Sequence, residues 1–462
     1  MNPNILFITF DSFRADKFFG QEKTSQTPNI KKLIESGVYF KQAITSADST
    51  ILALNTIFNA TFPSGGGNRT WKIKLRDENY LHFLKKCGYN MYGLIPDLTT
   101  FSQLTSIFEN DDSTFHALPP YAINPLISNT EKIKENISSM KMKEPWFYYI
   151  HSLDLHWPLV LPDEYNKEEF GQTQYDRMVS AVDPQLGKIL EVVDKKNTLI
   201  IITADHGQHI PFDEKGFQNF EPEFKTELNV GKKIMPKSTH KFGAKLIVGL
   251  RNKIRDKRLE KANKGLTPYQ KRSRLPHTTL SIFDETVRIP LLFTGLDISP
   301  KIIDKQVRSV DIFPTIVDLV GLSRRHDRFD GISLLPVFRN GEIKEKPVYM
   351  HTTPHVKLTS DDKVGIRTSK YKYFRGNDRN ENLNLYDLIN DPQENNNIAD
   401  DNFEIVEKME SILQEIESHS IFDDEDDEIS REETKTLENE LKKLGYIEED
   451  EKLSYEEVNS GK

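Results

Sequence analysis

A carboxylate and two imidazoles follow a buried-strand pattern near the middle of the chain. Leu199 to Ile202 is a run of apolar, mostly β-branched residues, which is typical of a strand buried on both faces. Asp205, His206 and His209 come directly after this run. Open α/β sheets usually place their chemistry at the carboxyl ends of the strands. We therefore expect a metal or an anionic substrate here, although a solvated turn that contains an Asp-His pair fits the same residues.

A second buried-strand pattern ends in the same way. Ile5 to Phe10 is followed directly by Asp11 and Ser12. Two strands that each end in an aspartate at one edge of a sheet could bring both carboxylates to one cation. Taken alone, Asp11 carries little weight, because Asp is common in the turns that follow strands.

A third strand pattern leads into a histidine-rich segment. Pro145 to Ile150 is strongly apolar, and His151, Asp154 and His156 come after it. This arrangement forms another edge rich in possible ligands. A single histidine of this kind, however, more often has a structural partner than a metal.

A hydroxyl stands at the start of a predicted helix. Apolar residues between Ile51 and Phe58 recur at intervals of three and four, so we expect a helix that begins at or near Ser49 or Thr50. The positive end of the helix dipole would stabilise an alkoxide at this position and attract an anionic ester. A purely structural helix cap explains the same residues, since Ser and Thr are favoured there.

The remaining pattern predicts the elements that position these residues. We expect further helices and strands over the following ranges: helices at 27–37, 80–88, 175–193 and 309–321, strands at 89–95 and 289–293, and short antiparallel strands at 348–350, 364–367 and 370–374, ending in Leu385 to Leu388. Long helices between short buried strands indicate an α/β fold with a mainly parallel sheet.

Composition and charge limit the class of protein. The chain has 462 residues with 37% hydrophobic content, enough for a large α/β domain and a smaller unit. Its single cysteine, Cys87, allows neither an internal disulfide nor a cysteine metal cluster. A net charge of -9 argues against general nucleic-acid binding. No signal-like leader and no run of eighteen apolar residues stands in the sequence, so we expect a cytoplasmic protein without a transmembrane segment.

Two charged segments divide the chain. Residues 211–275 lack a sustained strand pattern and are rich in Lys and Arg, whereas the segment from Phe422 to Glu451 is dominated by Asp and Glu. The first is either a solvated helical insertion or a lid that faces a polyanion or a membrane surface. We expect a catalytic domain at 1–340 that carries this insertion, a small α+β subdomain at 341–420, and an acidic helical tail at 421–462.

Six blocks, in order, resemble the sulfatase family of the alkaline phosphatase superfamily. They are NILFITFDSFRAD, HSLDLHWPLVLP, TLIIITADHG, HTTLSIFDETVRIPLLFTG, VDIFPTIVDLVGL with DGISLLP, and GIRTSKYKYF with LYDLINDPQE. The resemblance runs from Asn4 to about Tyr446, apart from the basic insertion. It implies an α/β/α sandwich with a large mixed, mainly parallel sheet and a small C-terminal antiparallel sheet.

The resemblance also assigns a role to Thr50. Family members carry the nucleophile at a helix start, thirteen residues before a proline, and Pro63 stands thirteen after Thr50. Ordinary sulfatases have Cys or Ser there, converted to formylglycine, with Pro two and Arg four residues on. This chain has Leu52 and Leu54 at those places. A threonine cannot become formylglycine, but it is the nucleophile in the phosphodiesterase and phosphoglycerol-transferase branches of the superfamily.

The same comparison implies a metal centre. Calcium-dependent sulfatases use adjacent aspartates after the first strand and Asp-Asn later, whereas this chain has Asp11-Ser12 and Asp205-His206. Because imidazole suits transition metals better than calcium, we expect one Mn2+ or Zn2+, and less favourably Ca2+, held by Asp11, Thr50, Asp205 and His206. His156 matches the family's His-x-Pro histidine, which implies leaving-group protonation or substrate binding. His277 is expected to contact the ester or the metal.

Three functions follow from these residues. The first is a metal-dependent hydrolase of sulfate or phosphate esters, with anionic esters linked to carbohydrate or lipid as candidate substrates. The second is a phosphodiesterase or phospho-alcohol transferase acting on a glycan or lipid, which the basic insertion would help to hold. The third is a catalytically inactive binding protein that keeps the fold, because the arginine four residues after the nucleophile is missing.

Overall fold

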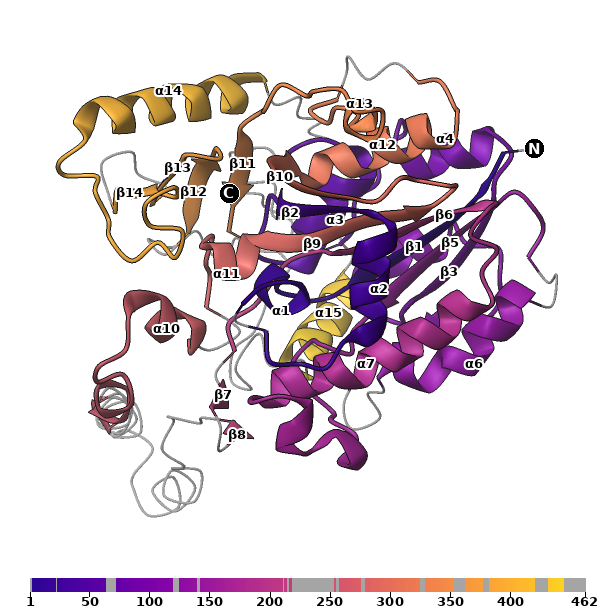
Figure 1. Ribbon diagram of the computed structural model, residues 1–462, viewed down its shortest axis with the longest axis horizontal. Helices are drawn as coiled ribbons and strands as arrows, with labels where there is room; N and C mark the ends of the chain where they lie inside the picture. The colour runs from indigo at the N-terminus through magenta and orange to yellow at the C-terminus, as the bar shows by residue number, and fades with distance from the viewer. Residues whose placement is uncertain are drawn as a thin grey trace.

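An eight-stranded sheet forms the centre of the protein (Figure 1). A computed structural model describes residues 2–21, 23–63, 72–118, 124–138, 142–210, 212–213, 216–217, 253–254, 257–275, 279–324, 329–352, 362–376, 382–419 and 431–443. In spatial order the strands of the central sheet are β10 (Lys301–Arg308), β2 (Val38–Ile44), β9 (Arg288–Gly295), β6 (Thr198–Ala204), β1 (Asn4–Phe10), β5 (Trp146–Ser152), β3 (Asn90–Pro96) and β4 (Thr114–Phe115). Strand β9 runs antiparallel to its neighbours β2 and β6, and the other pairs are parallel.

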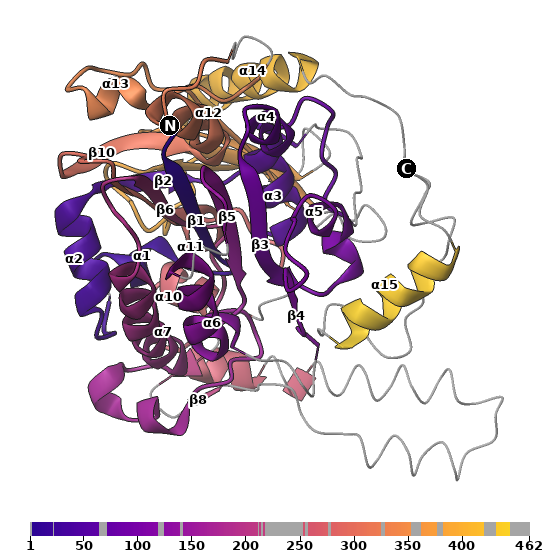
Figure 2. The ribbon, with the colours of Figure 1, turned by 90° about the vertical axis from the view of Figure 1, so that its right-hand side faces the viewer.

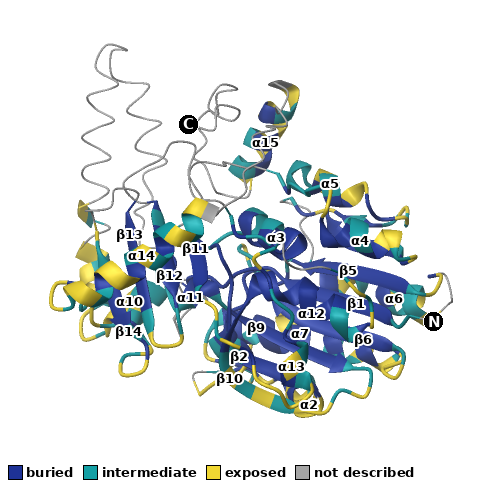
Figure 3. Ribbon diagram, turned by 90° about the horizontal axis from the view of Figure 1, so that it is seen from above, coloured by how far each residue is buried: buried dark blue, intermediate teal, exposed yellow. Residues whose placement is uncertain are grey.

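Strands β1, β5 and β6 lie side by side in the middle of this sheet. Every residue of the three strands is buried, as their apolar runs predict for strands covered on both faces (Figure 3). Because β1 pairs in parallel with both β5 and β6, the carboxyl ends of all three strands meet at one edge. The fold therefore brings the residues that follow these strands together.

Helices cover both faces of the sheet, with α2, α6 and α7 on one face and α4, α12 and α13 on the other (Figure 1). The helices and helical turns are α1 (Ala15–Phe18), α2 (Pro28–Ser36), α3 (Thr50–Asn59), α4 (Tyr80–Lys86), η1 (Thr99–Phe101), α5 (Ser102–Thr105), α6 (Pro125–Ser138), η2 (Asp163–Tyr165), η3 (Glu168–Phe170), α7 (Gln174–Glu191), α10 (Pro268–Ser273), α11 (Asp284–Val287), η5 (Ser309–Asp311), α12 (Ile312–Leu319), α13 (Leu335–Phe338), α14 (Phe403–His419) and α15 (Arg431–Lys443). The expected α/β/α sandwich is confirmed.

A separate antiparallel sheet follows, as expected. Its strands, in spatial order, are β11 (Val348–His351), β12 (Lys363–Arg367), β13 (Tyr371–Gly376) and β14 (Asn384–Asp387). Helix α14 packs on this sheet through a second hydrophobic core that includes Val406, Met409 and Leu413. Within the described residues, no helix is long and apolar enough to cross a bilayer.

The two charged segments are described only in part. In the insertion at 211–275 the structure describes the two-residue strands β7 (Phe212–Asp213) and β8 (Gly216–Phe217), residues 253–254, and residues 257–275 with α10. In the acidic tail it describes α15 alone. The domain boundaries and the partners of the insertion therefore stay predictions.

A buried ionic network joins the small sheet to the main domain. Asp284, at the start of α11, accepts hydrogen bonds from Arg367 at 2.9 and 3.0 Å and from Lys372 at 2.9 Å. The Lys372 ammonium also lies 2.8 Å from the carboxylate of Glu394, which in turn accepts a bond from the Asp284 backbone N–H. Burial is the main cause that raises the pKa of Glu394 to about 7.

We expect Glu394 to make stability fall as the pH rises. Its carboxyl binds a proton more tightly in the folded protein than in the unfolded chain, so its contribution is fully present below pH 4.5 and is lost as the pH approaches 7. One pKa unit corresponds to about 1.4 kcal/mol, so the loss is about 2 to 3 kcal/mol. Urea unfolding at pH 5 and pH 7.5 measures it. Glu394→Gln should reduce this difference and the exposed Glu404→Gln should not; equal pH dependence in all three proteins would contradict the expectation.

Candidate metal centre

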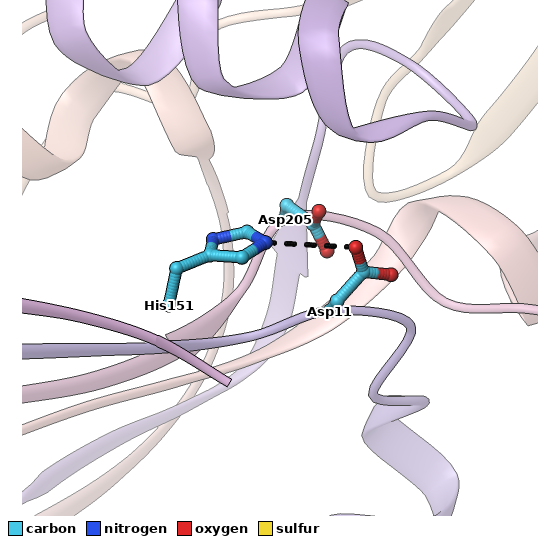
Figure 4. Close-up of side chains that lie close together, drawn as sticks. All are labelled: Asp11, His151 and Asp205. Atoms are coloured by element: carbon cyan, nitrogen blue, oxygen red, sulfur yellow. Dashed lines mark ion pairs between the residues drawn. The ribbon is translucent and has the colours of Figure 1, made fainter. Parts of the chain in front are cut away.

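Three ligand-bearing residues meet where β1, β5 and β6 end. Asp11 directly follows β1, His151 is the penultimate residue of β5, and Asp205 directly follows β6 (Figure 4). One ligand atom from each residue lies within 4.8 Å of the other two. The closest charged contact among them joins His151 Nε2 to Asp11 Oδ2 at 3.5 Å. All three side chains are buried.

Asp205 and His151 each keep one atom without a hydrogen-bond partner among the described residues. Asp205 Oδ1 accepts bonds from the backbone N–H groups of Ser12 at 3.2 Å and His206 at 2.7 Å, while Oδ2 has no hydrogen-bond partner among the described residues. His151 Nδ1 contacts the Tyr149 hydroxyl at 2.9 Å, and its Nε2 is likewise without a hydrogen bond in the described part of the chain. Buried polar atoms normally have partners, so these orphaned atoms fit a bound cation. Two carboxylates and an imidazole are a donor set that suits Mn2+ or Zn2+.

The backbone at Ser12 is held in an unusual conformation beside the triad. Its φ of 65° lies in the left-handed region that non-glycine residues rarely adopt. The Tyr175 hydroxyl donates to the Ser12 carbonyl at 2.7 Å, and the Ser12 hydroxyl donates to Asp11 Oδ1 at the same distance. Such strain persists where the surroundings fix it and is concentrated at functional sites.

Thr50 and His206 lie at the border of the triad. Thr50 is the first residue of α3 and Ser49 is its N-cap, without a side-chain capping bond. The Thr50 hydroxyl donates to Asp11 Oδ2 at 3.0 Å and lies 3.3 Å from His206 Nε2. His206 Nε2 is also 3.7 Å from both Asp11 Oδ1 and Asp205 Oδ2. The structure thus brings together all four residues expected at the metal.

The loop after β6 orients His206. Its Nδ1 lies 2.6 Å from the Gly207 carbonyl, a contact that requires an Nδ1–H donor, so Nε2 is the ring nitrogen that faces Thr50. A Cβ atom at Gly207 would stand 2.2 Å from the Glu285 carbonyl oxygen, so only glycine permits this close approach. In the Asp-His-Gly sequence the first two residues are therefore needed for chemistry, and the glycine is needed because a side chain would not fit.

The surroundings of the two aspartates shift their pKa values in opposite directions. For Asp11, burial opposes ionisation, but the imidazoles of His156, His151 and His206 outweigh it and lower the pKa far below the ordinary value. For Asp205, burial and then the Asp11 carboxylate raise the pKa. For His206, burial favours the neutral form, but the two carboxylates outweigh it and raise the pKa. Two carboxylates this close repel each other unless a cation or proton lies between them.

The other predicted histidines lie differently. His156 is partly buried in the turn after β5, where its backbone N–H donates to the Leu153 carbonyl, and its imidazole influences the pKa of Asp11. His209 is buried, and neither of its ring nitrogens has a hydrogen-bond partner among the residues described. His277 lies outside the described residues.

His151 is the ligand candidate that the sequence pattern did not single out. It stood in the histidine-rich segment after 145–150, but the strand extends through Ser152. Parallel pairing sets Thr9 of β1 opposite His151 and Phe10 opposite Ser152, which places this imidazole level with the end of β1. A histidine at the last inward-facing position of a buried strand beside two strands that end in aspartate is the signal that could have identified it.

Comparisons with known proteins agree with this fold. The family model described as Sulfatase matches residues 3–322, and the model of the N-sulphoglucosamine sulphohydrolase C-terminal region matches residues 279–419. Among curated proteins, the chain is 32% identical over 124 residues to choline-sulfatase of Rhizobium meliloti, which covers 26% of this chain and 23% of that protein. It is 30% identical over 132 residues to the Delta 4,5-hexuronate-2-O-sulfatase of Bacteroides thetaiotaomicron, covering 26% of each. The matched segments thus span about a quarter of these relatives.

Solved structures share the fold over most of the chain. The yidJ protein of Bacteroides fragilis superposes with a TM-score of 0.62 at 18% identity, over 90% of this chain and 95% of that one. A protein of the alkaline phosphatase superfamily from Vibrio parahaemolyticus gives a TM-score of 0.57 at 14% identity, over 90% and 86% of the two chains. Because the Sulfatase model spans more than half of the sequence, the chain belongs to the sulfatase family.

Proposed function

We propose that this protein is a metal-dependent hydrolase of sulfate or phosphate esters that uses Thr50 as its nucleophile. The observation that carries the proposal is the position of the Thr50 hydroxyl, 3.0 Å from Asp11 Oδ2 and 3.3 Å from His206 Nε2. A hydroxyl becomes an effective nucleophile when a neighbouring base or metal lowers its pKa. At the first residue of α3 it also faces the positive end of a helix dipole.

Asp11, His151 and Asp205 are the residues that would hold the metal, with His206 and Thr50 beside them. When bound, a divalent cation supplies charge neutralisation for the ester oxygens and a lower pKa for the coordinated hydroxyl. Because the cluster contains two imidazoles, we infer Mn2+ or Zn2+ in preference to Ca2+.

The chain's own groups can carry the proton steps. His206 Nε2 lies 3.3 Å from the Thr50 hydroxyl, so it can take the proton as Oγ1 attacks the sulfur or phosphorus atom. The ester bond to the leaving alcohol breaks, and we infer from the family's His-x-Pro histidine that His156 returns a proton to that oxygen. Water then attacks the sulfur or phosphorus atom of the covalent Thr50 ester, and its bond to Oγ1 breaks, which releases the sulfate or phosphate product and regenerates the hydroxyl. Positioning and charge neutralisation are most of what such a transfer needs.

The names of the relatives indicate a first substrate class. The two quoted curated relatives are named for sulfate esters of choline and of a hexuronate, and another of the curated relatives is an N-acetylglucosamine-6-sulfatase. We infer that sulfated carbohydrates are the substrates to test first. The basic insertion at 211–275 would contact a polyanionic substrate of this kind.

We expect turnover to depend on a transition metal. Metal-free protein is assayed on p-nitrophenyl sulfate, p-nitrophenyl phosphate and bis-p-nitrophenyl phosphate with Mn2+, Zn2+ or Ca2+, and the metal content is measured after dialysis. Turnover with Mn2+ or Zn2+ and little with Ca2+ is the expected result. Turnover that calcium alone supports would overturn the metal assignment, and absence of both turnover and retained metal would favour a binding protein.

A further inference from the structure

The acidic tail contributes a helix whose buried face includes a glutamate. In α15 the buried residues are Thr434, Leu437 and Glu440, spaced three apart on one face. Glu432, which belongs to the opposite, solvated face, is exposed. Figure 2 shows α15 lying on the outer side of β3 and β4, near α5, and the helix contacts η1. A glutamate is rarely buried without a specific partner.

Glu440 binds the turn that follows β3. Its two carboxylate oxygens each lie 3.1 Å from the Thr99 backbone N, and Oε1 also accepts a bond from the Thr99 hydroxyl at 2.9 Å. At the other end of the helix, Glu433 pairs with Lys72 at 2.8 Å. Charge-assisted bonds to a backbone N–H are stronger than neutral ones, so Glu440 fixes the first residue of η1.

The same turn contacts the metal centre. Phe101, the last residue of η1, is buried, and its ring meets the His151 imidazole edge-on with 5.1 Å between the ring centres. The imidazole also contacts the Tyr149 hydroxyl through Nδ1, at 2.9 Å. The direction of His151 Nε2 therefore depends on both contacts, and one of them is set by η1.

We propose that Glu440 is a positioning residue of the metal centre, because α15 holds η1 and η1 holds Phe101 against His151. Helix α15 then supports the metal centre from outside, although Glu440 lies 289 positions after His151 in the sequence. This inference rests on the proposed function, since it needs the triad to bind a metal. Groups that orient a metal ligand from outside commonly change metal affinity 10- to 100-fold, and we expect about tenfold for this more distant one.

The test uses the full chain and the metal alone. Zinc affinity is measured by calorimetry, and the visible spectrum of the Co2+-substituted protein reports the ligand geometry. Glu440→Ala should weaken zinc binding about tenfold and shift the cobalt bands. Glu440→Gln, which keeps one acceptor oxygen, should lie between Glu440→Ala and the unmodified protein. The exposed Glu432→Ala serves as the matched control and should behave as the unmodified protein does.

Phe101→Leu provides a second variant that leaves α15 untouched. It removes the ring contact with His151 and should reproduce the cobalt shift of Glu440→Ala. A merely structural role for Glu440 would lower the unfolding temperature and leave the zinc affinity and the cobalt spectrum of the folded protein unchanged, and that result would overturn the inference. Unmodified protein that binds neither metal would overturn the proposed function itself, which distinguishes the two failures.

Discussion

Thr50→Ala is expected to lower kcat by at least about 10³-fold, because removal of a nucleophile costs an enzyme most of its rate enhancement. The Thr50 hydroxyl is the group that bonds Asp11 Oδ2 and faces His206 Nε2, and alanine offers no atom in its place. Thr50 makes no capping bond, since Ser49 occupies the N-cap position. The variant should therefore stay folded, with a loss of about 1 to 3 kcal/mol of stability for the missing bond to the buried Asp11 carboxylate. Steady-state kinetics and thermal unfolding on the same sample measure both quantities.

Two neighbouring substitutions make this result specific. Thr50→Ser keeps the hydroxyl and should retain measurable turnover, whereas Ser49→Ala changes only the N-cap residue and should leave kcat within a few-fold. An inactive Ser49→Ala variant together with an active Thr50→Ala variant would show that Ser49, and not Thr50, is the nucleophile. In a burst experiment, the covalent ester should form on Thr50 and be absent from the alanine variant.

The sequence was sufficient for the architecture because the central strands repeat one physical pattern. The apolar runs of β1, β5 and β6 can be satisfied only by cover on both faces, and this fixes them in the middle of the sheet. Strand β10 was not predicted. Its sequence, KIIDKQVR, mixes charged and apolar residues without alternation, and its first five residues are only partly buried or exposed, so its pattern resembles that of a loop. Helix α6 was missed for a similar reason, because few of its residues are buried.

The site was predictable where a residue follows a strand and was not where the residue lies within one. Asp11 and Asp205 stand at strand ends, and their convergence follows from parallel order alone. The contribution of His151 depends on the register between β1 and β5, which no local pattern contains. The link from Glu440 to η1 joins residues 341 positions apart and could come only from the structure.

Asp205→Asn should have opposite effects on the protein with and without metal. The amide keeps an oxygen that can accept the backbone bonds now made to Oδ1 by Ser12 and His206, but it removes the carboxylate charge beside Asp11. Metal binding should be lost, while the free energy of unfolding of the metal-free form should rise by about 1 to 2 kcal/mol. This gain is well below the repulsion of roughly 4 kcal/mol between two like unit charges 4 Å apart near a protein surface. Calorimetric zinc titration and urea unfolding with and without EDTA measure the two effects.

The stability that Asp205→Asn adds to the metal-free protein should grow with pH, because it comes from removing an ionised carboxylate. Asp205 has a raised pKa in the folded protein, so without metal its contribution to stability is present below its ordinary pKa of 3.8 and is lost as the pH rises through the raised value. Asparagine does not titrate, so the variant should be the more stable metal-free form at pH 7 and lose that advantage at pH 4. In the unmodified protein, zinc at 100 times its Kd should raise the free energy of unfolding by about 2.7 kcal/mol. Asp183→Asn is the control: it replaces one of the two carboxylate oxygens that accept the Asn29 and Ile30 backbone N–H groups, so it should lose stability through that missing bond and keep the zinc response. A metal-free Asp205→Asn protein less stable than the unmodified one at pH 7 would mean that the two carboxylates do not repel, and the case for a cation between them would fail.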